Sequence, residues 1–262
     1  MKLGKMTLAL GLALSLGLGL TVGAPDARAD AAADKALAAG NKALEAVDLA
    51  VNRAKSQYLE YEATVKTPDK PDRILGISLW LKREMRLSEF TAPSDVKGTK
   101  VLIISPTQMY IYLPAYKKVR RVASHTTDQG FMGMTFSQDD FSLTYYKKWY
   151  VATITSDDGK NLKLLLTPIV GGEKPVYAKI EMVVEKARML PTEMKYFNEA
   201  GVKLKTETRS SYTCEGDVCA PAKLEMVDHQ KGGQSTTLAR KAWKPNVEIA
   251  DSKFTKRSLE EQ

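Results

Sequence analysis

The sequence predicts a mainly β protein with one N-terminal helix, built as a single antiparallel sheet, a barrel or a sandwich. Two observations support this. About a dozen short segments alternate apolar and polar side chains with a period of two, which is typical of half-buried strands. Turn residues such as Asp157-Asp158-Gly159 and Gly232-Gly233 separate them at the close spacing of a meander. The predicted strands are 58–66, 74–84, 85–91, 100–104, 108–113, 117–122, 149–156, 161–168, 177–186, 193–198, 202–212, 222–229 and 234–243.

The first 29 residues have the layout of a secretory signal. Two positive residues, Lys2 and Lys5, precede an apolar run from 6 to 24, and Ala27-Arg28-Ala29 fits the small-x-small rule for signal peptidase. A membrane anchor is the alternative, because a run of about 19 residues is close to the length that spans a bilayer. The glycines of the run favour cleavage after Ala29, so we expect residues 1–29 to be a signal peptide and the mature protein to be periplasmic.

The composition and hydrophobic periodicity of the sequence divide the rest of the chain into three parts. Residues 30–56 are Ala-rich and carry apolar side chains at helical spacings among charged ones, which predicts an amphipathic helix facing a core. Residues 57–250 hold the predicted strands and form one β domain. Residues 251–262 are charged and form a short C-terminal tail.

Cys214 and Cys219 are the two cysteines of the chain. In an oxidising periplasm they most simply form one structural disulfide. The residues between them, Glu215-Gly216-Asp217-Val218, contain turn formers, which puts the disulfide at or near a hairpin tip. No histidine or further cysteine lies near in sequence, so we do not expect a metal site here.

The sequence offers no catalytic motif. The two histidines, His125 and His229, are far apart and in no ligand spacing, and no nucleophile-elbow, zinc-protease or phosphate-loop motif accompanies them. His125 in Ala-Ser-His-Thr-Thr-Asp could be drawn as a general base of a hydrolase, but a solvated loop histidine explains it more simply. We assign no catalytic residue, cofactor or metal. The net charge of +8 is spread along the chain, which argues against nucleic-acid binding and allows weak peripheral contact with anionic membranes.

Several strands are apolar on both faces. Leu79 and Trp80 lie on opposite faces of one strand, as do Ile111 and Tyr112 of another. A sandwich would explain this, and so would a curved sheet that encloses a cavity. Residues 124–141 form the longest stretch without alternation, and long ordered loops in compact domains are usually functional.

Two motifs resemble those of bacterial outer-membrane lipoprotein-sorting proteins, which are similar to the periplasmic lipoprotein carrier of the Lol pathway. The family shows a YLP-x-x-K-x-x-R strand pair followed by an F-x-G loop. The matching residues are Tyr112, Leu113, Pro114, Lys117 and Arg120, then Phe131, Gly133, Phe136, Ser137, Asp140 and Phe141. The sequence departs from the family at Met134-Thr135, where Ser/Thr-Asp is common.

The resemblance implies a LolA-like fold, in which a curved antiparallel sheet forms an incomplete β-barrel around helices. It implies a non-enzymatic carrier that binds acyl chains of lipoproteins or lipids and receives them from an inner-membrane transporter. A hinged loop would open and close over the chain. Candidate cavity residues, each of which could instead be ordinary core, are Leu79, Tyr110, Tyr112, Phe131, Met132, Met134, Phe136 and Trp149. The alternative is an accessory or sensor protein of a membrane lipid exporter that acts through protein contacts.

Overall fold

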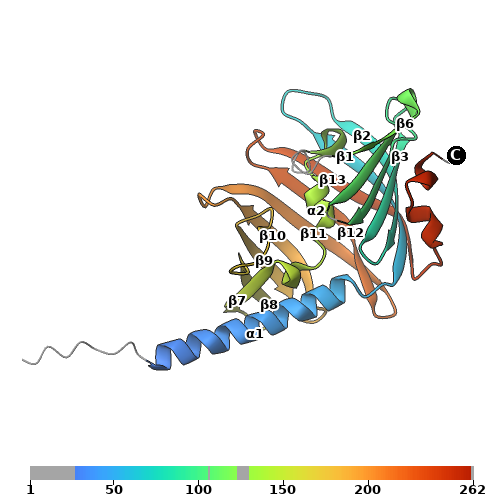
Figure 1. Ribbon diagram of the computed structural model, residues 1–262. Helices are drawn as coiled ribbons and strands as arrows, with labels where there is room; N and C mark the ends of the chain where they lie inside the picture. Colours follow the sequence, from blue (N-terminus) through green and yellow to red (C-terminus); the bar gives the residue numbers. More distant parts are fainter. Residues whose placement is uncertain (1–26, 106, 123–129, 261–262) are drawn as a thin grey trace, which may run out of the picture.

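The computed structural model describes residues 27–105, 107–122 and 130–260. Within them, thirteen strands form one antiparallel sheet, which is curved and does not close into a barrel (Figure 1). The predicted fold class is confirmed. The strands are β1 Ser56–Lys66, β2 Arg73–Lys82, β3 Met85–Ala92, β4 Lys100–Ser105, β5 Gln108–Leu113, β6 Lys118–Arg121, β7 Tyr150–Asp157, β8 Asn161–Pro168, β9 Lys179–Glu185, β10 Leu190–Phe197, β11 Lys203–Glu215, β12 Val218–Asp228 and β13 Gln234–Pro245.

The sheet consists of two meanders, β1 to β6 and β7 to β13, joined where β1 pairs with β13. Its two edges are therefore β6 and β7. The β6 edge is short and reads Lys-Val-Arg-Arg, and exposed edge strands of this kind resist pairing with other chains because their charges must stay hydrated. The β7 edge packs against the N-terminal helix α1 (Ala27–Val51).

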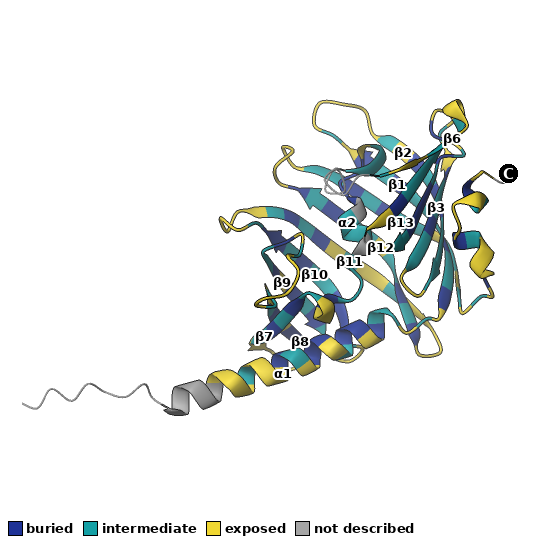
Figure 2. Ribbon diagram, viewed as in Figure 1, coloured by how far each residue is buried: buried dark blue, intermediate teal, exposed yellow. Residues whose placement is uncertain are grey.

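Helix α1 lies close to β7 because a glycine stands where the two elements cross. A Cβ at Gly40 would lie 2.0 Å from the carbonyl oxygen of Ala152, so only glycine fits at this crossing. The side-chain oxygen of Asn41 accepts a hydrogen bond from the Ala152 N–H at 2.9 Å. Leu44 and Val47 are fully buried in the core, whereas residues 33–35 and 37–39 near the start of the helix are exposed (Figure 2).

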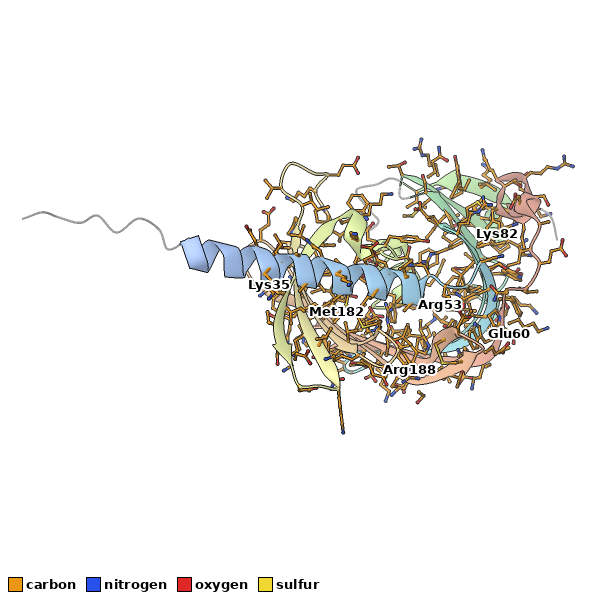
Figure 3. The ribbon with its side chains drawn as sticks, turned by 90° about the horizontal axis from the view of Figure 1, so that it is seen from below. Lys35, Arg53, Glu60, Lys82, Met182 and Arg188 are labelled. Atoms are coloured by element: carbon orange, nitrogen blue, oxygen red, sulfur yellow. A yellow bond between two sulfur atoms is a disulfide. The ribbon has the colours of Figure 1, made fainter. Side chains whose placement is uncertain are left out.

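The C-terminal end of α1 is fixed by polar contacts. The Asp48 carboxylate accepts the N–H groups of Tyr146 and Lys147, both at 2.9 Å, and so caps the 3₁₀ turn η4 (Tyr146–Lys148). Just beyond the helix, Arg53 pairs with Asp217 at the β11–β12 hairpin tip at 2.8 Å. In Figure 3, α1 runs across the front of the curved sheet and Arg53 marks this end.

The chain between the two edge strands crosses the concave side of the sheet, and we call its described part, residues 130–149, the crossing segment. It contains η3 (Phe131–Gly133), the helix α2 (Gln138–Ser142) and η4. The Thr135 N–H donates to the Thr236 hydroxyl at 2.8 Å, and the Thr135 hydroxyl donates to the Met226 carbonyl at 2.9 Å. The described part of the predicted hinged loop is therefore anchored to β12 and β13.

The C-terminal residues cover the convex side. The turns η5 (Asp251–Phe254) and η6 (Arg257–Leu259) pack against β3 and β4, where Phe254 and Leu259 are buried with Leu87 and Leu102. We call this the outer cluster. It explains why strands of the first meander are apolar on both faces: the concave side packs on the main core, and the convex side packs under the C-terminal turns.

The predicted disulfide is present. Cys214 and Cys219 face each other in the register of β11 and β12, next to the tight turn that joins these strands, and their sulfur atoms are bonded. Among residues 27–105, 107–122 and 130–260, no helix is both long and apolar enough to cross a membrane. The same part of the chain contains no group of three or more His, Cys, Asp or Glu side chains suited to a metal ion.

Candidate functional site

A cavity of about 220 Å³ lies between the concave face of the sheet, the crossing segment and the end of α1. Strands of both meanders contribute side chains to its wall. The crossing segment and the end of α1 cover the hollow of the curved sheet and so enclose the cavity. Its walls are mainly apolar. The apolar side chains that line it include Val51, Leu59, Ile77, Leu79, Leu81, Phe90, Val101, Ile103, Phe131, Met134, Phe136, Phe141, Leu143, Leu224 and Leu238.

Four of the eight predicted cavity residues lie in this wall. Leu79 comes from β2, and Phe131, Met134 and Phe136 come from the crossing segment. Met134 is 2% exposed and Phe136 is 3% exposed, so both also belong to the main core. Phe131 is only partly buried and its ring lies 5.4 Å from that of Phe90. Binding of a ligand by these residues stays a prediction.

Tyr110 and Tyr112 lie on the convex face of β5, away from this cavity. Both pack in the outer cluster under the C-terminal turns, and the Lys256 ammonium lies 6.0 Å from the Tyr110 ring centre. Their neighbours Met109 and Ile111 take the inward positions instead. Alternation could not separate the two faces, because both are covered and both are apolar.

Met132 and Trp149 also lie outside the cavity wall. Met132 packs on the edge of the main core in a left-handed backbone conformation with φ of 52°. Trp149 follows η4 and borders a separate small pocket together with Glu84 and Tyr145. His125 lies outside the described residues, and His229 is a surface residue whose ring nitrogen is 2.8 Å from the Thr206 hydroxyl.

The cavity also contains charged groups that sequence reasoning missed. Glu207 and Arg209 of β11 both line it and form an ion pair at 2.7 Å. The second carboxylate oxygen of Glu207 accepts the Tyr196 hydroxyl at 2.7 Å, which satisfies this buried anion. Burial is the largest single effect and acts to lower the pKa of Arg209, but the charge of Glu207 and three nearby tyrosines together raise this pKa well above its ordinary value.

A second buried ion pair joins β11 to the crossing segment. Lys205 donates to Asp140 of α2 at 2.6 Å, and Asp140 also accepts the Tyr177 hydroxyl and the backbone N–H of Ser137. The exposed fractions of the two side chains are 11% for Lys205 and 3% for Asp140. The pair therefore contributes to holding α2 on the sheet, and each of the two charges has an opposite charge beside it.

Arg86 of β3 also lines the cavity. Burial, together with the nearby positive charge of Arg209, lowers the pKa of Arg86 to about 10, so it stays charged at neutral pH. Among the described residues, no carboxylate forms an ion pair or a hydrogen bond with its guanidinium. The site thus combines an apolar chamber with an uncompensated positive charge.

The missed residues had a weak signal in the sequence. Lys205, Glu207 and Arg209 alternate along β11, a pattern that ordinarily marks the solvent face of a strand. The cue for Arg86 was its parity: it shares a face of β3 with Phe90, which is 1% exposed. A charge in phase with a core position indicates an interior role.

Solved structures of other proteins share the fold of this chain. A DUF1329 family protein from Desulfovibrio piger superposes with a TM-score of 0.77 at 21% identity, over 86% of this chain and 99% of that one. A domain of an outer membrane lipoprotein-sorting protein from Vibrio parahaemolyticus gives 0.73 at 23% identity, over 86% and 99%. A LolA superfamily protein from Nitrosomonas europaea gives 0.69 at 17% identity, over 84% and 99%.

No curated protein matches the chain. A family model described as "Uncharacterized protein" matches residues 82–261, which include strands β3 to β13, the crossing segment and both C-terminal turns. The match covers more than half of the sequence. The chain therefore belongs to the family of that model, and its fold is that of the outer-membrane lipoprotein-sorting and LolA superfamily proteins.

Proposed function

We propose that this protein is a periplasmic carrier that shelters an acyl chain of a lipoprotein or lipid in the cavity between the concave sheet, the crossing segment and α1. The acyl chain enters the cavity at the inner membrane, where a transporter delivers it, and leaves at the outer membrane. The observation that carries the proposal is the apolar cavity itself, lined by side chains from β1 to β4, β11 to β13 and the crossing segment. The LolA-like fold and the sequence of residues 1–29 support it.

The physical chemistry of the cavity suits transport. Each buried methylene contributes about 0.8 kcal/mol, so a partly buried chain already binds usefully. The cavity volume of about 220 Å³ is below the roughly 300–1,000 Å³ of pockets for drug-sized ligands. It therefore holds one chain or part of one, which limits the affinity and allows release to a membrane.

The proposal requires a path for the chain to enter. Just beyond the end of α1, near the cavity residues Asn52 and Ala54, the contact with the hairpin tip is the Arg53–Asp217 pair, whose side chains are 45% and 74% exposed. Surface ion pairs of this kind contribute about 0–1 kcal/mol each, so this contact can open at low cost. The crossing segment, in contrast, is held by buried groups such as Thr135. We infer that the chain enters beside α1.

Filling the cavity tests the proposal. Ser88 of β3 lines the cavity, and Ser88→Phe places a ring where the chain would lie. We expect this variant to lose uptake of a fluorescent acyl probe while it keeps the circular dichroism spectrum of the wild type. Ser156→Phe, on an exposed position of β7, is the matched control and should bind like the wild type. Equal uptake by all three proteins would contradict the proposal.

A non-transport role makes a different prediction. If the protein acts as an accessory or sensor subunit of a lipid exporter, protein purified from membranes should carry a stable protein partner and no lipid. Native mass spectrometry of the purified protein separates the two functions, because a carrier should retain a co-purifying lipid or acylated peptide.

A further inference from the structure

We propose that the cavity selects amphiphiles that carry an anionic group, a carboxylate or a phosphate, next to the acyl chain, and that the guanidinium of Arg86 recognises this group. The inference rests on the proposed function, since it names the class of ligand that the acyl-chain cavity takes. It excludes a purely uncharged acyl moiety as the preferred cargo.

The position of Arg86 places its charge inside the cavity. In the register of the sheet it lies opposite Leu81 of β2 and Ile103 of β4, and all three side chains line the cavity. Ser88 and the buried Phe90 follow Arg86 on the same face of β3. The guanidinium therefore stands at the boundary of apolar walls, where the head of a bound amphiphile would meet it.

Two other interior cations are already paired with carboxylates. Arg209 is paired with Glu207, and Lys205 is paired with Asp140. The groups whose charges act on Arg86 are Arg209, which repels it, and the hydroxyls of three tyrosines, Tyr61, Tyr145 and Tyr146. Among the described side chains that line the cavity, Arg86 is thus an interior cation without a paired anion. The Arg86 side chain is partly buried, and a partly buried charge without a counterion carries a desolvation cost that an anionic ligand lowers.

The chemistry of the guanidinium fits such a ligand. Its planar array of N–H donors matches carboxylate and phosphate oxygens, often in pairs, and these charge-assisted hydrogen bonds are about twice as strong as neutral ones. Arg83, in the turn between β2 and β3, also lines the cavity but is exposed. It adds positive potential at the rim and provides a matched control for Arg86.

Competition for a bound uncharged fluorescent acyl probe at pH 8 tests the inference. The competitors are dodecanoate, dodecyl phosphate and 1-dodecanol, which share one chain length and differ in the charge of the head. We expect both anions to compete at concentrations at least about tenfold lower than the alcohol does, as a charge-assisted hydrogen bond implies. Arg86→Met should remove this preference, so that all three competitors act at similar concentrations. Arg83→Met should keep the preference.

The outcomes separate the two proposals. If the wild type binds 1-dodecanol and the anions equally, or if Arg86→Met keeps the preference, the inference about the head group is wrong and the acyl-chain cavity stands. If no competitor displaces the probe and the probe itself does not bind, the proposed function is wrong. Incubation with phosphatidylglycerol vesicles, followed by native mass spectrometry, then tells a phospholipid source from a free fatty acid.

Discussion

Replacing Arg86 by methionine should make the ligand-free protein more stable. Burial and Arg209 lower the pKa of Arg86 from 12.5 to about 10, and each pKa unit corresponds to about 1.4 kcal/mol. The folded state therefore holds the charged form at neutral pH at a cost of about 3 kcal/mol. A depressed pKa in a base means that this cost is present at every pH below about 10. Methionine is apolar, flexible and close in length, so it suits the neighbours Leu81 and Ile103.

We expect Arg86→Met to raise the free energy of unfolding by about 1–3 kcal/mol, or the Tm by about 2–4 °C per kcal/mol. Urea titration at pH 7 measures it. Arg209→Met is the matched control with the opposite expected sign, because it leaves Glu207, which is 3% exposed, without its cation. Breaking a buried pair in this way costs about 3–5 kcal/mol. A loss of stability in Arg86→Met comparable to that in Arg209→Met would refute the claim that Arg86 is uncompensated.

Three further predictions concern the elements that enclose the cavity. Gly40→Val should displace α1 from β7, because its Cβ would lie 2.0 Å from the Ala152 oxygen; limited proteolysis should cut the helix, whereas equal resistance would contradict the packing. Lys205→Met should lower the free energy of unfolding by about 3–5 kcal/mol by leaving Asp140 buried and unpaired; an unchanged urea midpoint would disprove this. Burial raises the pKa of Asp48 above its ordinary value, so the folded state binds more protons than the unfolded state, and stability falls as the pH rises through that pKa; Asp48→Asn should lack this fall in urea titrations between pH 4 and 7.

The strands and their order could be predicted because one face of almost every strand meets a core. The segment 161–168, for example, was predicted as a strand and is β8. The alternation of β8 is clear because Leu162, Leu164 and Leu166 are buried and the residues between them are not. Turn residues then fixed the hairpins, and the resemblance supplied the open barrel.

The face of a strand was harder to predict where both sides are covered. Tyr110 and Tyr112 looked like cavity residues, but Phe254 and Leu259 return from the C-terminus to cover them. Nothing within β5 records that long-range contact. The residue type does not help either, because an aromatic side chain packs as well under a covering turn as in the wall of a ligand cavity.

The polar part of the site was missed for a related reason. The charged face of β11 looks solvated because local sequence does not show that Asp140, from a distant segment, neutralises Lys205 in the interior. Arg86 was missed for a different reason. Its position in the alternation of β3 is that of a core residue, but a single charged residue near the end of a strand usually lies on the surface. Three-dimensional pairing decides which charges are compensated, and pairing between distant segments is not visible in one sequence.

Photo-cross-linking with a diazirine-bearing fatty acid tests the central claim most directly, since it reports where the chain lies. The account predicts labels, mapped by peptide mass spectrometry, on the concave side at Leu79, Ile103 and Phe131, and competition by unlabelled dodecanoate. Labels confined to the outer cluster around Tyr110 and Tyr112, or no competable label at all, would contradict it.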